Sequence, residues 1–243
     1  EISKMLQMVK LIYKDIFNFE YSLEYSTRPD KFLGDKKDWD EAEKILEKAL
    51  KESKAKYMMS KGGGAFYGPK IDIHIKDSLN RDWQCATIQL DMQMPKRFEL
   101  TYIDKDNKEN TPFIIHRAIL GSIERFIGVL LEHTNGNLPL WLSPIQVRVI
   151  SFTDRNLESS KKIFQELKQR IPNLRINLDL ESTTVSDKVR HAEIQRIPHI
   201  LVIGDKEEQS KTLAVRSRGS KPKFGVKTED FVSDIKNKIE NRE

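Results

Sequence analysis

Cysteine is nearly absent from this 243-residue sequence: Cys85 stands alone, which excludes an internal disulfide framework. Long hydrophobic runs are also missing, because no apolar stretch approaches the roughly 20 residues that span a bilayer. The first residues, Glu1 to Lys4, contain neither an initiator methionine nor a signal peptide, so we expect the chain to begin inside a domain. Together these absences predict a globular cytoplasmic protein from a reducing compartment, with no membrane partner.

The composition supports real hydrophobic cores and an uneven charge. Hydrophobic residues make up 38% of the chain and charged residues 33%, which suits one large or two ordinary domains. Residues 1–143 hold 22 Lys and Arg against 22 Asp and Glu, whereas residues 144–243 hold 20 against 15. The net charge of +5 therefore lies in the last hundred residues. This excess favours a polyanionic partner, although an ordinary solvated surface explains it equally well.

The first part of the chain predicts an antiparallel sheet covered by helices. Apolar residues recur at helical spacing, alternate with polar residues in short runs, and are separated by short turns. An apolar helix after the last strand would pack on the sheet. The expected helices are residues 4–17, 38–52 and 122–133, and the expected strands are residues 19–25, 71–75, 86–91, 98–103 and 113–116.

A second domain is expected after two turn-rich segments that follow residue 134. Strand and helix patterns alternate almost throughout the remaining sequence, which is typical of an α/β domain with a mainly parallel or mixed sheet. We therefore expect two domains, residues 1–140 and 145–243. The expected elements of the second are residues 147–152, 156–170, 175–180, 186–196, 199–204, 212–216 and 228–240.

One motif in the first part suggests an anion or nucleotide site, although a strand followed by an amphipathic helix explains it equally well. A strand-like run ends at Gly121 and opens a helix with Arg125 on its first turn, so free helix amides and a guanidinium would lie together. A glycine-rich loop, residues 62–72, and the segment 87–91 lie upstream. In this order and spacing, the three motifs resemble the catalytic domain of the threonyl-tRNA synthetase family, and residues 121–125 resemble motif 3 of class II aminoacyl-tRNA synthetases.

The resemblance implies how these residues would serve ATP and threonine. Arg125 would lie over the adenine and near the phosphates, with Gly121 and Ser122 shaping the floor, and Gln84 would contact ATP. Lys70 would offset negative charge near the activated carboxyl group. The residues assigned to the threonine pocket are Tyr67 and Gln89.

The resemblance also implies two metal ions. Mg²⁺ would accompany ATP, and Zn²⁺ would recognise threonine by its amino and hydroxyl groups, which valine cannot match. His116 matches one zinc ligand of the family, although a histidine that closes an apolar strand is by itself more often a hydrogen-bonded core residue. In the family the other two protein ligands, a cysteine and a histidine, belong to segments upstream of Glu1. Neither Cys85 nor any other histidine of this chain has metal-ligand spacing that would replace them.

The last hundred residues resemble the anticodon-binding domain shared by the threonyl, prolyl, glycyl and histidyl synthetases. Glu207 and Arg216, expected on neighbouring strands, are the candidate base readers, since carboxylates and guanidinium groups match base edges. A solvated strand edge is the plain alternative. Four further basic residues would contact phosphates of the threonine tRNA: Lys188, Arg190, Arg196 and Arg218.

The family's motif 1 and motif 2 would precede Glu1. The resemblance therefore implies a fragment, inactive alone, of a longer and homodimeric threonine–tRNA ligase. Two alternatives stay open. One is a non-catalytic module that binds tRNA or structured RNA, and the other is a sister synthetase for proline or glycine.

Overall fold

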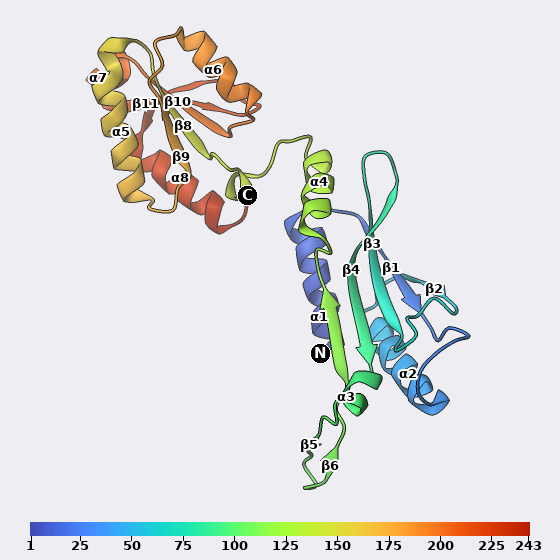
Figure 1. Ribbon diagram of the computed structural model, residues 1–243. Helices are drawn as coiled ribbons and strands as arrows, with labels where there is room; N and C mark the ends of the chain where they lie inside the picture. The colour runs from blue at the N-terminus through green and yellow to red at the C-terminus, as the bar shows by residue number, and fades with distance from the viewer. The chain divides into compact units, whose positions relative to one another are not determined.

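The computed structural model describes residues 1–243 as two compact units, Glu1–His133 and Thr134–Glu243 (Figure 1). The second unit begins before the expected domain limit at residue 145, because Leu140 is 5% exposed and packs in the hydrophobic core of that unit. None of the helices is long and apolar enough to cross a membrane.

The first unit is built on a five-stranded sheet with the strand order β2-β1-β3-β4-β7. β1 pairs with β2 in parallel, and the other three pairs are antiparallel, as the short turns predict. A separate two-stranded hairpin, β5-β6, follows β4. The strands are β1 (Tyr21–Ser26), β2 (Tyr57–Ser60), β3 (Lys70–Lys76), β4 (Asp82–Asp91), β5 (Tyr102–Ile103), β6 (Glu109–Asn110) and β7 (Ile114–Ala118).

Helices cover one face of this sheet and leave the other to polar side chains. Ile71, Ile73 and Ile75 alternate along β3 and are at most 1% exposed. Tyr25 of β1 pairs with Ile71 of β3, so its side chain points to the same face as the isoleucines. Its hydroxyl donates to the carbonyl oxygen of Glu43 in α2, so α2 lies on this apolar face. The helices are α1 (Ile2–Lys10), continued by a π-helical segment (Leu11–Ile16), α2 (Lys36–Glu52), α3 (Gln93–Arg97) and α4 (Ile123–His133).

The expected strand at residues 98–103 is mostly wrong. Only Tyr102–Ile103 pairs, and the short helix α3 occupies the chain just before it. The reason lies in Asp91, whose Oδ1 accepts the backbone N–H groups of Gln93 at 2.8 Å and Met94 at 3.0 Å. A carboxylate that satisfies two free amides starts a helix directly after the strand.

The second unit has a mixed five-stranded sheet, as the alternating pattern predicts. Its order is β12-β11-β10-β8-β9, with β9, β8 and β10 parallel and β11 and β12 antiparallel. Its elements are a 3₁₀ turn (Leu140–Leu142), β8 (Val147–Ser151), a second 3₁₀ turn (Asp154–Asn156), α5 (Leu157–Arg170), β9 (Ile176–Asp179), α6 (Val185–Ile194), β10 (His199–Ile203), α7 (Asp205–Ser210), β11 (Thr212–Ser217), β12 (Lys223–Lys227) and α8 (Thr228–Glu240).

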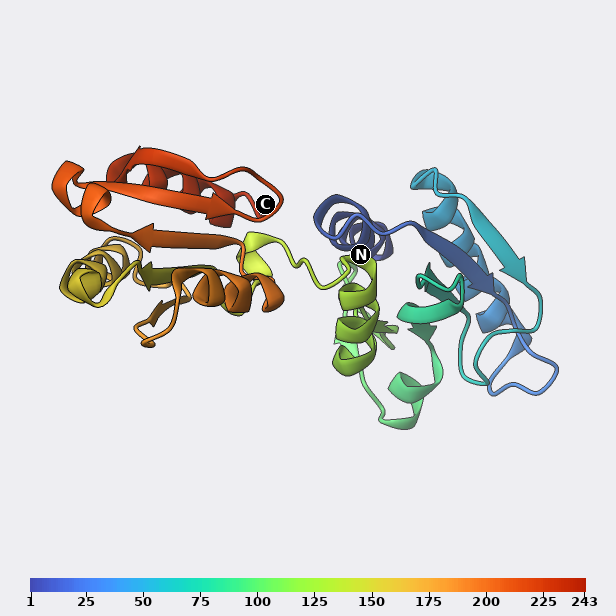
Figure 2. The ribbon, with the colours of Figure 1, turned by 90° about the horizontal axis from the view of Figure 1, so that it is seen from above.

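Both faces of this second sheet are covered (Figure 2). Val147 and Val149 of β8 pack in a core with Leu167 of α5 and Phe231 of α8. Ile150, the next residue of β8, packs in a separate cluster that includes residues of α6. Successive residues of β8 therefore pack into two hydrophobic layers, one on each face of the sheet, as is typical of an α/β domain.

Candidate functional site

Three of the predicted residues lie side by side across three strands of the first unit. Lys70 of β3 pairs with Gln89 of β4, and Gln89 pairs with His116 of β7. Directly paired residues point to the same face of a sheet. This is the polar face, opposite the isoleucines of β3, so register alone places an ammonium, an amide and an imidazole in one row.

Tyr67 completes this row from the loop before β3. Its hydroxyl donates to Oε1 of Gln89 at 2.7 Å, and its ring meets that of His116 edge to face, with 5.9 Å between centroids. The loop can approach this closely because Gly68 lies against β4. A Cβ atom on Gly68 would fall 1.8 Å from the carbonyl oxygen of Leu90.

The glycines of this loop are required for different structural reasons. A Cβ atom on Gly64 would lie 2.6 Å from the carbonyl oxygen of Thr27, so close backbone packing demands glycine there. At Gly62, by contrast, φ is +76° and nothing lies within 4 Å, so only the left-handed backbone favours glycine.

His116 is held by a buried carboxylate that the sequence analysis did not single out. Nε2 of His116 lies 2.8 Å from Oδ2 of Asp91. The Asp91 side chain is 0% exposed, whereas that of His116 is 46% exposed. Because a carboxylate only accepts, this contact places the imidazole proton on Nε2 and leaves Nδ1 as the acceptor nitrogen. Alternation along β4 from Gln89 could have revealed Asp91.

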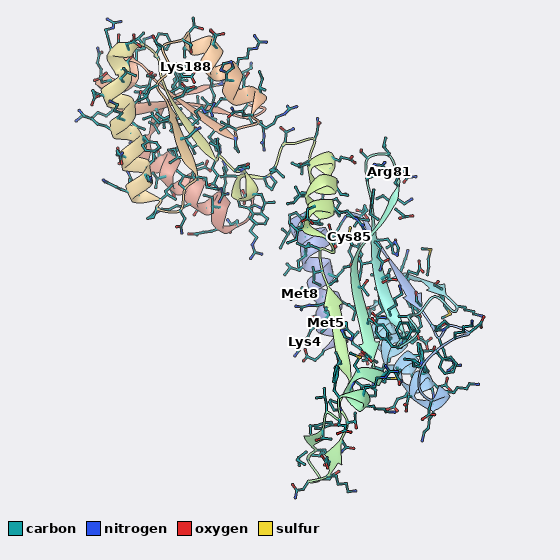
Figure 3. The ribbon with its side chains drawn as sticks, viewed as in Figure 1. Lys4, Met5, Met8, Arg81, Cys85 and Lys188 are labelled. Carbon is teal, nitrogen blue, oxygen red and sulfur yellow. The ribbon has the colours of Figure 1, made fainter.

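Gln84 reaches the same polar face through an irregularity in β4. The register shifts between Ile73 and His74, so that Ala86 pairs with Ile73 while Gln84 pairs with His74. Cys85 is the extra residue of this bulge, and its position on β4 is labelled in Figure 3. Strict alternation would turn Gln84 toward the helices, and the bulge turns it back.

Gln84 then joins Lys70 on one buried acceptor, Asp72. Oδ2 of Asp72 lies 2.7 Å from Nζ of Lys70, and Oδ1 accepts from Nε2 of Gln84 at 2.7 Å. The hydroxyl of Thr87, paired with Asp72 across the strands, donates to the same Oδ1 at 2.8 Å. Asp72 therefore links two predicted site residues that stand 14 positions apart in the sequence.

The segment from Gly121 forms the start of α4 as expected. Gly121 has φ of +63°, and a Cβ atom there would lie 2.8 Å from the carbonyl oxygen of Cys85. The hydroxyl of Ser122 accepts the backbone N–H of Arg125 at 3.3 Å, which caps the helix.

Arg125 lies beside Gln84, on an aromatic surface that sequence reasoning missed. Its guanidinium carbon is 5.3 Å from the ring centroid of Trp83, and Nη1 is 3.5 Å from the carbonyl oxygen of Gln84. Trp83 is fixed in turn, because its Nε1 donates to Oδ2 of Asp77 at 2.8 Å. Arg125 thus contacts the backbone of Gln84, whose side chain belongs to the Asp72 network.

Cys85 takes no part in this polar surface. Its side chain is buried, and burial raises the pKa of the thiol while Arg125 opposes the shift. A neutral buried thiol is a poor metal ligand and a poor nucleophile.

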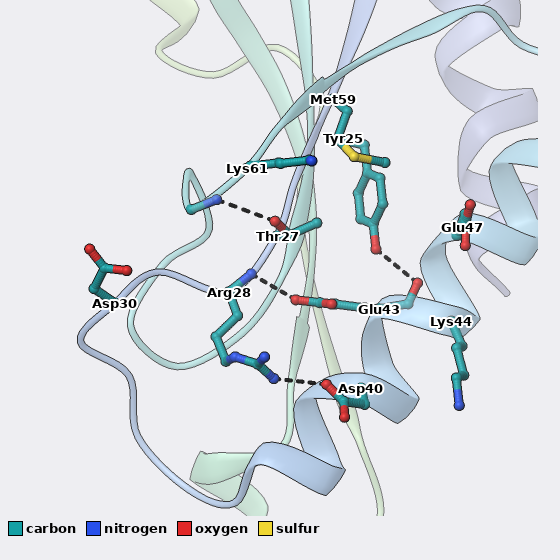
Figure 4. A pocket seen from close by; sticks show the side chains of 11 residues that line it. Tyr25, Thr27, Arg28, Asp30, Asp40, Glu43, Lys44, Glu47, Met59 and Lys61 are labelled. Atoms are coloured by element: carbon teal, nitrogen blue, oxygen red, sulfur yellow. Dashed lines mark hydrogen bonds and ion pairs between the residues drawn. The ribbon is translucent and has the colours of Figure 1, made fainter.

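A separate groove of about 770 Å³ lies on the first unit between β1, β2 and α2 (Figure 4). None of the predicted site residues lines it. Arg28 bridges it by donating to Oδ1 of Asp40 at 2.8 Å and, from its backbone N–H, to Glu43 at 2.7 Å. Its lining charges of both signs are thus partly engaged with one another.

A groove of about 940 Å³ on the second unit contains Glu207, Arg216 and Arg190. Two aromatic residues that sequence reasoning missed also line it: Phe152 is 52% exposed and Phe224 is 74% exposed. In the sequence, the signal that could have revealed them is an aromatic residue close to a charged residue. Such rings can stack on unpaired bases.

The expected strand position of Glu207 is wrong. Glu207 lies in α7, directly after β10, and its Oε2 accepts the backbone N–H of Gly204 at 3.1 Å. The side chain therefore closes the helix start by a capping interaction. Glu207 also lines the groove, and this contact engages only one of its two carboxylate oxygens.

Two of the predicted phosphate ligands have structural partners. Lys188 is 2% exposed, and its Nζ donates to Oγ of Ser151 at 3.0 Å (Figure 3). Arg218 donates to the carbonyl oxygens of Arg196 at 2.9 Å and Leu138 at 2.7 Å. Burial, together with the charge of Arg196, lowers the pKa of the Arg218 guanidinium. The geometry thus gives Lys188 a packing role in place of the expected phosphate contact, because its ammonium points into the unit.

Arg196 and Arg218 nevertheless share a second groove with Arg216. This groove has about 490 Å³ and continues along β11 and the turn after it. Arg190, Arg216 and Arg218 are all exposed. The predicted basic residues other than Lys188 therefore lie around one connected surface of the second unit.

Comparison with known proteins agrees with both units. Residues 1–134 match the family described as tRNA synthetase class II core domain (G, H, P, S and T), and residues 146–238 match the anticodon binding domain. The threonine–tRNA ligase of Clostridium novyi (strain NT) is 45% identical over 242 residues, which are 99% of this chain and 38% of that protein. The threonine–tRNA ligase of Sulfurihydrogenibium sp. (strain YO3AOP1) is 46% identical over 100% of this chain and 37% of that protein.

A solved structure is similar to this chain over nearly its whole length. The RNA binding domain of threonyl-tRNA synthetase from Cryptosporidium parvum Iowa II superposes with a TM-score of 0.90 at 38% identity, covering 97% of this chain and 59% of that chain. The chain therefore belongs to the class II aminoacyl-tRNA synthetases, with a class II core followed by an anticodon-binding domain. Within that class its homologues are threonine–tRNA ligases, which confirms the resemblance carried by the three motifs. The chain spans 37–38% of the length of these two relatives.

The resemblance implies a zinc ion, and His116 is the residue of this chain expected to bind it. No group of three or more His, Cys, Asp or Glu residues that could hold a metal occurs in it. His116 fits as a single ligand, because one ring nitrogen is held by a buried carboxylate and the other is left as an acceptor. Carboxylate partners of this kind are usual behind zinc-bound histidines.

Proposed function

We propose that the protein containing this chain ligates threonine to its tRNA in two steps. The threonine carboxylate attacks the α-phosphate of ATP and pyrophosphate leaves. A terminal ribose hydroxyl of tRNA then attacks the carbonyl carbon and AMP leaves. The observation that carries this proposal is the row of Lys70, Gln89 and His116 with Tyr67 against it, because a protein that only binds RNA has no physical need for that row.

The threonine side of the reaction belongs to Tyr67, Gln89, Lys70 and His116. Tyr67 fixes the amide of Gln89 by donating to its Oε1, which leaves the amide's N–H groups free to bind the substrate. The Lys70 ammonium, 22% exposed, lies at the start of β3, where it can offset charge on the carboxylate. His116 would supply one ligand to Zn²⁺, which when bound coordinates the amino and hydroxyl groups of threonine and so rejects valine.

The ATP side belongs to Gln84, Arg125 and the backbone at Gly121 and Ser122. Arg125 spans Trp83 and the carbonyl of Gln84, so its planar guanidinium is oriented in advance. A fixed guanidinium can stack on adenine and neutralise phosphate charge, and Mg²⁺ would accompany the triphosphate. The chain spans only 37–38% of the length of two related threonine–tRNA ligases, which supports the proposal that the 243 residues alone do not make adenylate.

The groove of the second unit would read the anticodon. Arg216 and Glu207 present a donor fork and a carboxylate acceptor, and Phe152 and Phe224 provide exposed rings for unstacked bases. Arg190 and Arg196 stand at its margins, where contact with phosphates positions the RNA without specifying its sequence.

The test is ATP–pyrophosphate exchange by the longest natural form of the protein with threonine, serine, valine or proline, alongside a His116→Ala variant. We expect exchange with threonine, rejection of valine, and collapse in the variant. Exchange that prefers proline would favour a sister synthetase. No exchange with any amino acid, while tRNA still binds, would replace the ligase by a non-catalytic RNA-binding module.

A further inference from the structure

Asp72 is the only side chain among those described above that touches both the threonine side and the ATP side of the proposed site. It is 3% exposed, and its carboxylate has three partners: Lys70, Gln84 and Thr87. Nε2 of Gln84 also donates to Oγ1 of Thr87 at 2.9 Å. The two carboxylate oxygens of Asp72 thus accept from the ammonium of Lys70, the amide of Gln84 and the hydroxyl of Thr87 in one closed network.

The balance of donors shows why an anion stands at this position. Lys70, the Gln84 amide nitrogen and the Thr87 hydroxyl all act as donors toward Asp72. A neutral amide in place of the carboxylate would turn an N–H group toward either Lys70 or Gln84, and one donor would lose its partner. Buried donors without partners are costly, so they move to other positions.

We propose that Asp72 is a positioning residue for adenylate formation, which holds Lys70 and Gln84 in one network so that carboxylate and ATP meet in register. This inference rests on the proposed function. It adds a residue that contacts neither substrate and acts only through its two neighbours. Misplacement of reacting groups by about 1 Å lowers rates by about 100-fold, so the effect is measurable.

The test uses the longest natural form of the protein and compares Asp72→Asn with Asp72→Ala in ATP–pyrophosphate exchange. Asparagine keeps an acceptor for Gln84 but loses the counter-charge of Lys70, so we expect exchange to fall about 10- to 100-fold with little change in the KM for ATP. Alanine removes both contacts and should raise the KM for ATP as well. If Asp72 had only a structural role, the fall in exchange rate would not occur in Asp72→Asn without the rise in the KM for ATP expected of Asp72→Ala.

Three comparisons make the result decisive. Asp72→Asn should cost little further exchange in a Lys70→Ala background, because the variant acts through that lysine. Glu43→Gln, a matched loss of a carboxylate on the opposite face of the sheet, should leave exchange unchanged. Thermal unfolding of each variant shows whether it is folded at the assay temperature.

The inference is overturned if Asp72→Asn exchanges at the unchanged rate, or if its effect is fully additive with that of Lys70→Ala. These outcomes differ from failure of the proposed function. If the proposed function were wrong, the unchanged protein would show no ATP–pyrophosphate exchange, or neither Lys70→Ala nor Gln84→Ala would alter the exchange rate. The role of Asp72 would then be refuted as well.

Discussion

The carboxylate of Asp91 lies 2.8 Å from Nε2 of His116, so a fully buried anion fixes the ring that would bind a metal ion. The other oxygen of Asp91 accepts two backbone amides at the start of α3. The backbone of α3 therefore fixes the Asp91 carboxylate through one oxygen, and the carboxylate fixes His116 through the other. This double attachment sets both the orientation of the imidazole and the nitrogen that stays available.

Asp91→Asn should weaken zinc binding by the longest natural form of the protein about 10- to 100-fold, the usual effect of losing such a partner. The amide cannot accept from His116 and from the α3 amides as strongly as the carboxylate. Competition with a chromophoric chelator measures the affinity directly, and Glu43→Gln serves as control. Equal affinities in Asp91→Asn and the unchanged protein would contradict the role given to Asp91.

Arg216→Ala should weaken tRNA recognition by about 1 to 3 kcal/mol, the range for a lost paired contact to a base. Adenylate formation should be untouched, because Arg216 lies on β11 in the second unit. Filter binding and pyrophosphate exchange measure the two effects separately. Arg170→Ala, which removes an arginine that pairs with Glu166 and Glu229 on the same unit, is the control. A parallel loss of both activities would refute this division of labour.

Gly68→Ala should destabilise the protein, because the added Cβ atom would lie 1.8 Å from the carbonyl oxygen of Leu90. Overpacking of this kind costs about 1 to 3 kcal/mol, and it would also shift Tyr67 away from Gln89. Gly128→Ala is a matched control, since Gly128 is an exposed residue of α4 with nothing within 4 Å of its added Cβ atom. That change should stabilise by about 0.5 to 1 kcal/mol. Urea unfolding of both variants checks the pair, and equal effects would show that the loop is not packed as described.

His199 should make the stability of the second unit depend on pH. Burial, together with the charge of Lys238, lowers the pKa of His199 from 6.5 to about 4, with Asp234 opposing. The unfolded chain therefore binds more protons than the folded chain between these values. The contribution is complete above pH 6.5 and is lost as pH falls toward 4, and it amounts to about 3 kcal/mol at most.

Urea unfolding at a series of pH values, from 7.5 to about 4, measures this loss against His199→Gln, which has no imidazole to titrate. The glutamine variant should show a shallower fall in stability over that interval. Parallel curves for the two proteins would mean that His199 is not the group responsible.

Much of the site could be read from sequence because its residues stand on regular strands. Gln89 and His116 lie in segments whose alternation predicts strands, and Lys70 directly precedes such a segment. The helix after Gly121 begins where Ser122 can cap it. The class of fold followed from the same periodicities. The strand expected at residues 98–103 is reduced to Tyr102–Ile103. The helix α3 just before it starts at the carboxylate of Asp91, a contact that no strand pattern records.

The sequence by itself determined the class of the two folds through its periodicities and the family through the order of its motifs. The residues of the Lys70 row came from the resemblance to that family. Only the tertiary structure decided how those residues meet. Strand register aligns the row, the bulge at Cys85 turns Gln84 onto the site face, and burial makes Asp72 and Asp91 common acceptors. It also gave Lys188 and Glu207 local partners. The physical reason is that register, bulges and desolvation depend on contacts between distant segments, and no local pattern records them.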